Sequence, residues 1–271
     1  MIASSPDVGY IQEPFNPTHR PGICEAETDR YFLHARDSDP DIWRAGLQNT
    51  LAFRYAYQAE WAAVRSSKDL LRMIRDAGTF AWHRLRQRRA LMKDPIALFS
   101  AEWIAETFDA KVVLLMRHPA GFASSLKRLG WDFPFEHLLS QPHLMDTLLA
   151  PFKEKIDAYR RDRACIVDQA ILLWRIFAHT ITIYQERHPE WHFVRHEDVA
   201  TNPISNFRPI FNHLDLEFTD CVEETIRHHT TASNSAEASN NAIHDLKRDS
   251  SALAHIWRQR LTTEEIDRVF E

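Results

Sequence analysis

Short runs of apolar residues alternate along this chain with longer segments in which apolar residues recur every three or four positions. The short runs predict β-strands, and the longer segments predict amphipathic α-helices. The predicted strands cover residues 8–11, 90–92, 111–116 and 192–194. The predicted helices cover residues 42–61, 68–77, 99–108, 120–129, 168–188, 205–214 and 221–228. Strands and helices that alternate in this way predict an α/β fold, in which helices flank a parallel sheet on both faces.

The clearest candidate site lies in the segment 111–129. The apolar run 111–116 predicts a strand that is buried on both faces, and Arg117 follows at its carboxyl end. A proline two positions later suits a first helical turn, so a helix is expected to begin near residue 120. The free backbone N–H groups of this helix, the guanidinium of Arg117 and the hydroxyl of Ser124 or Ser125 would together form a receptor for a phosphate group.

Two further polar residues follow predicted strands. Glu13 comes after the strand 8–11, and Lys93 comes after the strand 90–92. Ligands of parallel α/β sheets bind outside the carboxyl ends of the strands. We therefore expect Glu13, Lys93 and Arg117 to lie along the same edge of one sheet.

Length and composition limit the class of protein. With 271 residues, 44% of them hydrophobic, the chain can bury a substantial core, and we expect a single domain that spans residues 1–271. The formal net charge of −5 and a pI near 6.3 argue against a nucleic-acid partner, which normally meets a basic surface. Basic residues that are clustered locally could still bind one small anion.

The cysteines and histidines give no sign of a disulfide framework or a metal site. Cys24, Cys165 and Cys221 are widely spaced and odd in number, which fits a reducing cytoplasm. The 15 histidines show no spacing typical of metal ligands, so we expect no metal. No run of about 18 apolar residues predicts a membrane span, and the first twenty residues do not read as a signal peptide.

Several motifs in order along the chain resemble those of sulfotransferases that use PAPS (3′-phosphoadenosine 5′-phosphosulfate). A strand that ends in arginine, followed eight positions later by serine, resembles the family motif for the 3′-phosphate, and Arg117 and Ser125 have this spacing. Three other segments match in the family order, namely IQEPFNP at 11–17, LMKDP at 91–95 and VRHEDVATNP at 194–203. The resemblance covers nearly the whole chain.

The resemblance implies a fold, a donor and an acceptor class. The fold would be the three-layer, P-loop-NTPase-like sulfotransferase fold, with a parallel sheet flanked by helices. The chain would transfer a sulfuryl group from PAPS to a hydroxyl or amine of a small molecule, lipid or sugar, and release PAP. PAPS would be a co-substrate, and no metal would be needed. The oligomeric state is not predicted.

The resemblance also implies catalytic roles. Lys93 matches the family lysine that contacts the transferring group, although a solvated lysine at a strand end is the alternative interpretation. Glu13 is the candidate general base, and a structural carboxylate that accepts backbone hydrogen bonds is the alternative. Asp94 is a weaker candidate base. Pro95 stands where cytosolic sulfotransferases place a catalytic histidine, so that histidine mechanism is excluded at this position.

The remaining donor-binding candidates are Arg117, Ser125, His196, Lys247 and Arg248. An ordinary surface arginine and a helix serine are the alternative for the first two. His196 takes the place of a family tyrosine beside the adenine and could stack in the same way, or it could be a simple surface histidine. Lys247 and Arg248 loosely resemble the C-terminal loop that closes on the 3′-phosphate, although the spacing differs and the glycine is absent.

The resemblance also predicts a departure from the family pattern. In sulfotransferases a strand, a loop that resembles GxPRSGTT and a helix precede the segment that matches SSPDVGYIQEPFN, which here begins at Ser4. We therefore expect the first β-loop-α unit to be missing, through a misassigned start codon, a gene fragment or genuine loss. Without this loop the polypeptide is expected to bind PAPS poorly and to turn over slowly or not at all.

Two other functional hypotheses stay open. The first is a non-catalytic relic that keeps the fold and the 3′-phosphate pocket as a binding module. The second is another phosphate-binding α/β transferase, such as a small-molecule kinase, which should carry a GKS/T loop that the sequence lacks. The DNA upstream of the Met1 codon would separate truncation from true loss.

Overall fold

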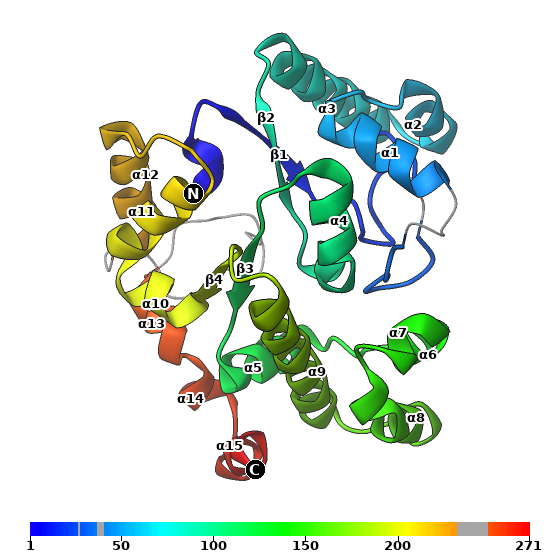
Figure 1. Cartoon of the computed structure of the whole chain (residues 1–271), viewed down its shortest axis with the longest axis vertical. Helices are drawn as coiled ribbons and strands as arrows, with labels where there is room; N and C mark the ends of the chain where they lie inside the picture. The colour runs from blue at the N-terminus through cyan, green and yellow to red at the C-terminus, as the bar shows by residue number, and fades with distance from the viewer. Residues whose placement is uncertain (27, 37–40, 232–248) are drawn as a thin grey trace. The chain divides into compact units, whose positions relative to one another are not determined.

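The computed structural model describes residues 1–26, 28–36, 41–231 and 249–271, and it divides the chain into two compact units. The N-terminal unit contains residues 3–110 and 140–144, and the C-terminal unit contains residues 1–2, 111–139 and 145–271. Figure 1 shows the helices and strands of both units. The expectation of one domain stays a prediction.

The N-terminal unit is built on two parallel strands, β1 and β2. Its elements are β1 (Val8–Gln12), α1 (Asp41–Leu51), α2 (Tyr57–Ala63), α3 (Ser67–Leu85), β2 (Arg89–Lys93), the 3₁₀ helix η2 (Pro95–Ser100) and α4 (Ala101–Phe108). Two short helices, η1 (Ile2–Ser4) and α7 (Pro142–Asp146), include residues of both units. The strands pair in register from Val8 opposite Arg89 to Gln12 opposite Lys93. This register explains why Glu13 and Lys93 end up together.

The core of the N-terminal unit joins β1 to the inner face of α3. Ile11 of β1 packs with Ala77 and Phe80 of α3. Phe53 and Tyr55, from the loop between α1 and α2, join the same cluster. Ala77 and Phe80 lie on one face of α3, as the amphipathic pattern of the sequence predicts. The packing fixes the strand β1 and therefore the position of the residues that follow it.

The C-terminal unit is built on a second parallel pair, β3 and β4. Its elements are β3 (Val113–Met116), α5 (Pro119–Leu129), α6 (Glu136–Leu139), η3 (Ala150–Phe152), α8 (Lys153–Arg161), α9 (Ile166–Arg187), β4 (His192–Arg195), α10 (His196–Thr201), α11 (Pro203–His213), α12 (Asp220–Thr230), α13 (Ser250–His255), α14 (Trp257–Arg260) and α15 (Thr263–Phe270). The two strands pair from Val113 opposite His192 to Met116 opposite Arg195. Both strands therefore end at the same level, and a helix begins after each.

Helix α9 packs against α5 and contributes much of the core of its unit. The side chains of Ala170, Leu173, Ile176 and Tyr184 are fully buried. By length and composition alone, α9 is also the one helix in the described ranges that could cross a membrane.

The α/β class with parallel strands flanked by helices is confirmed, but two predicted helices differ from the structure. The segment predicted as one helix over 42–61 forms α1 and α2, separated by a turn in which Phe53 has a φ of +50°. The helix predicted to end near Gly78 continues to Leu85. Buried Phe80 and His83 anchor this extra length, and their packing outweighs the roughly 1 kcal/mol that a helical glycine costs.

The predicted burial of the segment 111–116 is wrong. Val113 and Leu114 are only half-buried, and the side chain of Leu115 is 55% exposed. The physical reason is pairing, because in the described part of the chain β3 pairs with β4 alone. One continuous sheet was expected, whereas the described strands form two separate two-stranded sheets, one in each unit.

Candidate active site

The turn between β3 and α5 brings Arg117 and Ser125 together. The Nη1 of Arg117 donates a hydrogen bond to Oγ of Ser125 over 2.8 Å. The guanidinium lies against the first turn of α5, where a methyl group added at Gly121 would come within 3.2 Å of its Nε. Ser124, the other candidate, is fully buried and donates to the carbonyl of Gly121 instead. Ser125 is therefore the serine that contacts the arginine.

The position of Arg117 is held from the protein interior. The indole Nε1 of Trp174 on α9 donates to the backbone carbonyl of Arg117 over 2.7 Å. Burial lowers the pKa of the Arg117 guanidinium, whereas the carboxylate of Glu197 acts in the opposite direction. An arginine stays protonated in proteins even in such surroundings. The turn thus holds a partly desolvated positive charge whose hydrogen-bond partner, Ser125, is neutral.

Glu197 joins the two strand ends, and the sequence analysis did not single it out. Its Oε1 accepts a hydrogen bond from the backbone N–H of His118 over 3.0 Å. The carboxylate also lies 3.6 Å from Nδ1 of His196. Because Met116 pairs with Arg195, the residues that follow the two strands come side by side. The sequence did contain one signal that could have pointed to Glu197. It is an acidic residue two positions after Arg195, the last residue of β4.

His196 lies beside Arg117 as a neutral ring. Burial lowers the pKa of His196, the charge of Arg117 lowers it further, and Glu197 opposes both effects. Its Nδ1 is buried and has no hydrogen-bond partner in the described part of the chain. A neutral, partly buried imidazole of this kind offers a ring face and a nitrogen to a ligand. Its predicted role beside an adenine stays a prediction.

Aromatic residues and arginines surround the start of α5. The ring of His118 stacks on Trp257, with centroids 5.3 Å apart and planes 11° from parallel, and Phe270 meets His118 edge-on. The positive charge of Arg260 lowers the pKa of Arg117. We call Arg117, Ser125, His196 and Glu197 the Arg117 cluster.

The predicted ligands Lys247 and Arg248 lie outside the described residues. In the described sequence that follows, Arg258 and Arg260 supply positive charge near the start of α5, as their effects on His118 and Arg117 show. The roles of Lys247 and Arg248 at the 3′-phosphate stay a prediction.

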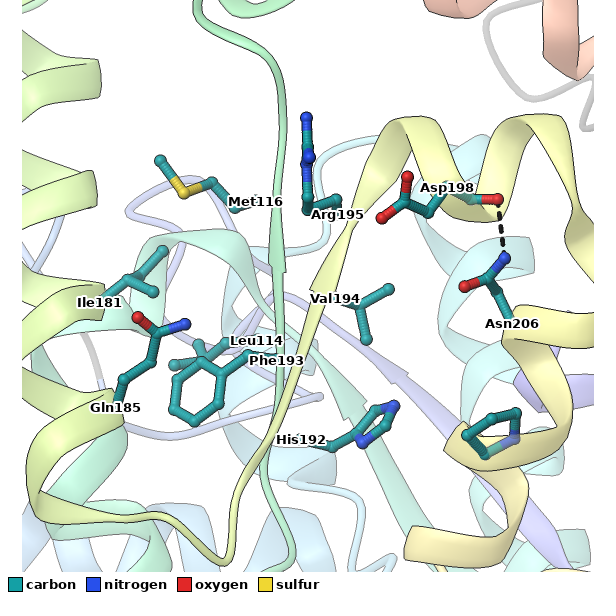
Figure 2. A pocket seen from close by; sticks show the side chains of 11 residues that line it. Leu114, Met116, Ile181, Gln185, His192, Phe193, Val194, Arg195, Asp198 and Asn206 are labelled. Carbon is teal, nitrogen blue, oxygen red and sulfur yellow. Dashed lines mark hydrogen bonds between the residues drawn. The ribbon is translucent and has the colours of Figure 1, made fainter.

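A cavity of about 400 Å³ runs along the same strand pair (Figure 2). Leu114, Met116 and Val194 contribute apolar lining, and Arg195 and Asp198 contribute charged groups. Met116 and Arg195 are the last residues of their strands, so the cavity reaches the level at which the Arg117 cluster begins. Its size is within the range of small-molecule pockets.

The second cluster lies at the ends of β1 and β2. The Nζ of Lys93 forms an ion pair with Oε1 of Glu13, and Nδ2 of Asn16 donates to Oε2 of Glu13 over 3.1 Å. The backbone N–H of Glu13 also donates to the carbonyl of Lys93 over 3.0 Å. The Lys93 side chain is 53% exposed and the Glu13 side chain 19%. We call Glu13, Asn16 and Lys93 the Lys93 cluster.

Glu13 has an unusual backbone conformation. Its φ of +47° lies in the left-handed region, which a residue with a Cβ rarely adopts. Asn16 lies three residues later and donates both its backbone N–H and its side-chain amide to Glu13. A tight turn therefore holds the carboxylate in place, and strained backbone of this kind is common at functional sites.

Asp94 has a structural role in this neighbourhood. Its two carboxylate oxygens accept hydrogen bonds from the backbone N–H groups of Phe15, over 2.7 Å, and Ile96, over 3.0 Å. Burial raises the pKa of Asp94 to about 6, although both hydrogen bonds act against this rise. Asp94 thus ties the segment after β1 to the start of η2, and both of its oxygens are engaged.

The described residues contain no group of three or more His, Cys, Asp or Glu side chains that could hold a metal ion. The two clusters lie in different units, with Arg117 and His196 in the C-terminal unit and Glu13 and Lys93 in the N-terminal unit. In the described sheets, Glu13 and Lys93 follow paired strands, as expected, whereas Arg117 follows a strand of the other sheet.

Comparison with known proteins gives a family match. The family model described as "Sulfotransferase family" matches residues 26–220, which is more than half of the chain. A search of curated protein sequences returned no match.

Two solved structures resemble this chain. The sulfotransferase domain from the curacin biosynthetic pathway is 13% identical, with 82% of this chain and 77% of that domain covered and a TM-score of 0.42. The sulfotransferase domain from the Synechococcus PCC 7002 olefin synthase is 14% identical, with 97% and 92% covered and a TM-score of 0.44. At these TM-scores the family assignment rests on the family model.

Proposed function

The chain belongs to the sulfotransferase family, and from this premise we propose that it transfers a sulfuryl group from PAPS to a hydroxyl or amine. The observation that carries the choice of donor is the contact between Arg117 and Ser125 at the start of α5. A guanidinium, a hydroxyl and the first turn of a helix are the groups that bind a phosphate monoester. The acceptor class that we propose is a small molecule, lipid or sugar.

In this proposal the Arg117 cluster binds the 3′-phosphate of the nucleotide. The Nη1 of Arg117 turns from a neutral hydroxyl to an anion, and the Ser125 hydroxyl donates to the same anion. Such charge-assisted hydrogen bonds are roughly twice as strong as neutral ones. The neutral ring of His196 is suited to stack on a base. This cluster would hold the nucleotide without taking part in bond making.

The Lys93 cluster would act on the transferring group. The acceptor oxygen or nitrogen attacks the sulfur, the bond from sulfur to the bridging phosphate oxygen breaks, and PAP leaves with that electron pair. The Nζ of Lys93 stabilises the charge that develops on the bridging oxygen. A carboxylate oxygen of Glu13 takes the proton that the acceptor loses. The ion pair suggests an order, because Oε1 of Glu13 is released for the acceptor once Lys93 turns toward the donor.

We further propose that the protein acts in the cytoplasm. Cys24 is buried as a free thiol, and Cys165 and Cys221 are exposed free thiols. Exposed thiols suit a reducing compartment.

Calorimetric titration with PAP tests the donor. We expect weak, saturable binding, in line with the poor PAPS binding predicted from the sequence, and Arg117→Ala should weaken it further, about 30- to 100-fold, because a charge-assisted bond to a phosphate is lost. Ser125→Ala should weaken it less. Arg128→Ala is the matched control, because Arg128 is an exposed arginine of the same helix.

Two outcomes decide between the functional classes. Absence of binding in titrations that reach millimolar PAP would overturn PAPS as the donor. Binding without transfer of radiolabelled sulfate from PAPS to any acceptor in a panel of alcohols, amines, lipids and sugars would favour the non-catalytic binding module.

A further inference from the structure

Helix α3 carries a stripe of large apolar side chains on its exposed face. Leu71, Ile74, Trp82 and Leu85 are all substantially exposed, with Leu71 at 68% and Leu85 at 76%. At about 100° per residue these positions fall within an arc of about 80°. Gly78 lies in the middle of this arc, and no atom comes within 4 Å of a Cβ built there. The stripe is therefore open along a length of about 21 Å.

The stripe is separate from the core-facing side of the same helix. Ala77, Phe80 and His83 are buried and lie on the opposite side of α3, where they pack on the core of the N-terminal unit. An amphipathic surface helix normally carries polar residues opposite its buried face. Contiguous exposed apolar residues in place of these polar residues mark an interaction surface.

The neighbouring helix α2 also exposes two aromatic rings, Tyr57 and Trp61, but these lie apart from the stripe. Helices α2 and α3 contact each other and lie side by side in Figure 1. Tyr57 meets Tyr55, which packs on Phe80 at the core-facing side of α3. We therefore name the stripe of α3 alone, made of Leu71, Ile74, Trp82 and Leu85, the α2–α3 face after this pair of helices.

The α2–α3 face lies in the most basic part of the chain. Residues 54–89 contain nine Lys or Arg and three Asp or Glu, although the whole chain has a net charge of −5. Arg72 and Arg75 flank the stripe on α3, where each also lies near an aspartate of the same helix. Arg86 lies over the ring of Trp82, 4.5 Å from its centroid. Positive charge is therefore concentrated around the apolar residues.

We propose that the α2–α3 face binds the surface of an anionic lipid bilayer. Leucine and isoleucine side chains on one helix face partition into the boundary between headgroups and acyl chains. Tryptophan and tyrosine rings favour the headgroup level, and clustered arginines bind anionic headgroups. The α2–α3 face combines all three features. The binding is peripheral, with the helix parallel to the membrane plane, and it does not depend on the proposed sulfuryl transfer.

The charge of the face favours lipid over a second copy of this chain. Two copies that met through the α2–α3 face would bring two strongly basic segments together, and like charges across an interface are costly. An anionic bilayer instead supplies negative charge and an apolar phase to the same surface. A second copy of this chain and an acidic protein are the alternative partners, and the experiments below test lipid against both.

Co-sedimentation of the full chain with vesicles tests the proposal. One set of vesicles contains phosphatidylcholine alone, and the other contains equal parts of phosphatidylcholine and phosphatidylglycerol. We expect binding at least about tenfold stronger to the anionic vesicles, and weaker binding as salt is raised, because each basic residue near the surface adds to the attraction. Equal binding to both vesicles, which would show that negative charge on the lipid plays no part, or no binding to either, overturns the proposal.

Variants separate the apolar and the charged contributions. The double variant Leu71→Ser and Leu85→Ser should lower the partition coefficient about tenfold or more. Arg75→Gln with Arg86→Gln should weaken binding to anionic vesicles and flatten its salt dependence. Leu129→Ser is the matched control, because Leu129 on α5 is 69% exposed and lies in the other unit.

Circular dichroism shows whether each variant is folded, and only folded variants are compared. Sedimentation velocity without lipid provides the last arm of the test. If the wild-type chain self-associates and the double leucine variant does not, the face belongs to a second copy and the proposal fails.

Discussion

The Arg117 cluster and the Lys93 cluster each place a cation at the carboxyl end of a parallel strand, but they balance its charge differently. Arg117 is partly desolvated and bonds to a neutral hydroxyl, and the carboxylate of Glu197, which acts to raise the pKa of Arg117, is bonded to a backbone N–H. Lys93 is half exposed and its ammonium pairs directly with the carboxylate of Glu13.

This difference in charge balance suggests that the two clusters have different roles. A fixed cation whose hydrogen-bond partner is neutral is suited to hold an anion throughout a reaction. A mobile cation that already has a carboxylate partner is suited to respond when charge develops. We therefore expect changes in the Arg117 cluster to alter nucleotide affinity, and changes in the Lys93 cluster to alter turnover.

The largest expected effect is that of Lys93→Met. Removing the ammonium should lower kcat about 10²- to 10³-fold, because a preorganised charge near the developing anion is lost. Affinity for PAP should change less than about threefold, since in the proposed function the Arg117 cluster holds the nucleotide. Initial rates with radiolabelled PAPS and calorimetry with PAP measure the two quantities.

Lys153→Met is the control for this variant. Lys153 is similarly exposed, at 59%, and it also pairs with a carboxylate, that of Asp146. A Lys93→Met enzyme with the kcat of the wild type would show that Lys93 is a solvated lysine at a strand end, and would remove the division between the two clusters.

An intermediate effect is expected at Glu197. Glutamine keeps an oxygen that can accept from the N–H of His118 but removes a negative charge near Arg117, so Glu197→Gln should tighten PAP binding about threefold. Alanine removes the hydrogen bond as well and should weaken binding about tenfold. Calorimetry with PAP measures both.

Asp198→Asn is the control for the charge. Asp198 is the next residue of α10, and the same charge is removed there. If this variant tightens PAP binding as much as Glu197→Gln, the effect belongs to the net charge of α10 and the placement of Glu197 does not matter.

The smallest effect on activity is expected at Asp94, whose contribution is to stability. Burial raises the pKa of this carboxyl to about 6 in the folded state, so the folded protein binds the proton more tightly than the unfolded chain does. The contribution of Asp94 to stability therefore increases as the pH falls from above 6 to about 4, by roughly 1–3 kcal/mol. Asp94→Asn should flatten this part of the pH profile in urea unfolding. A profile identical to that of the wild type would contradict the assignment.

The sequence allowed several parts of this picture to be predicted. The strands at 8–12 and 113–116 and the long helix α9 follow from apolar runs and helical periodicity, which depend on local residue order. The contact between Arg117 and Ser125 follows from a strand and a helix joined by a short turn. Local order was sufficient for these elements.

Other parts depend on contacts between distant residues, which one sequence does not reveal. Helix α3 continues past Gly78 because Phe80 and His83 are buried by side chains far away in the chain. The role of Glu197 depends on the register between β3 and β4, which aligns Met116 with Arg195. Register is set by the packing of both strands and cannot be read from either one alone.

The left-handed backbone at Glu13 has a consequence for how this protein can change. A glycine or asparagine would adopt that conformation more easily, by about 1 kcal/mol in the case of glycine, but neither could serve as a carboxylate base. Under the role that we propose for Glu13, selection for a robust fold and selection for turnover would favour different residues at this one position. Such conflicts explain why gains in stability so often cost an enzyme part of its rate.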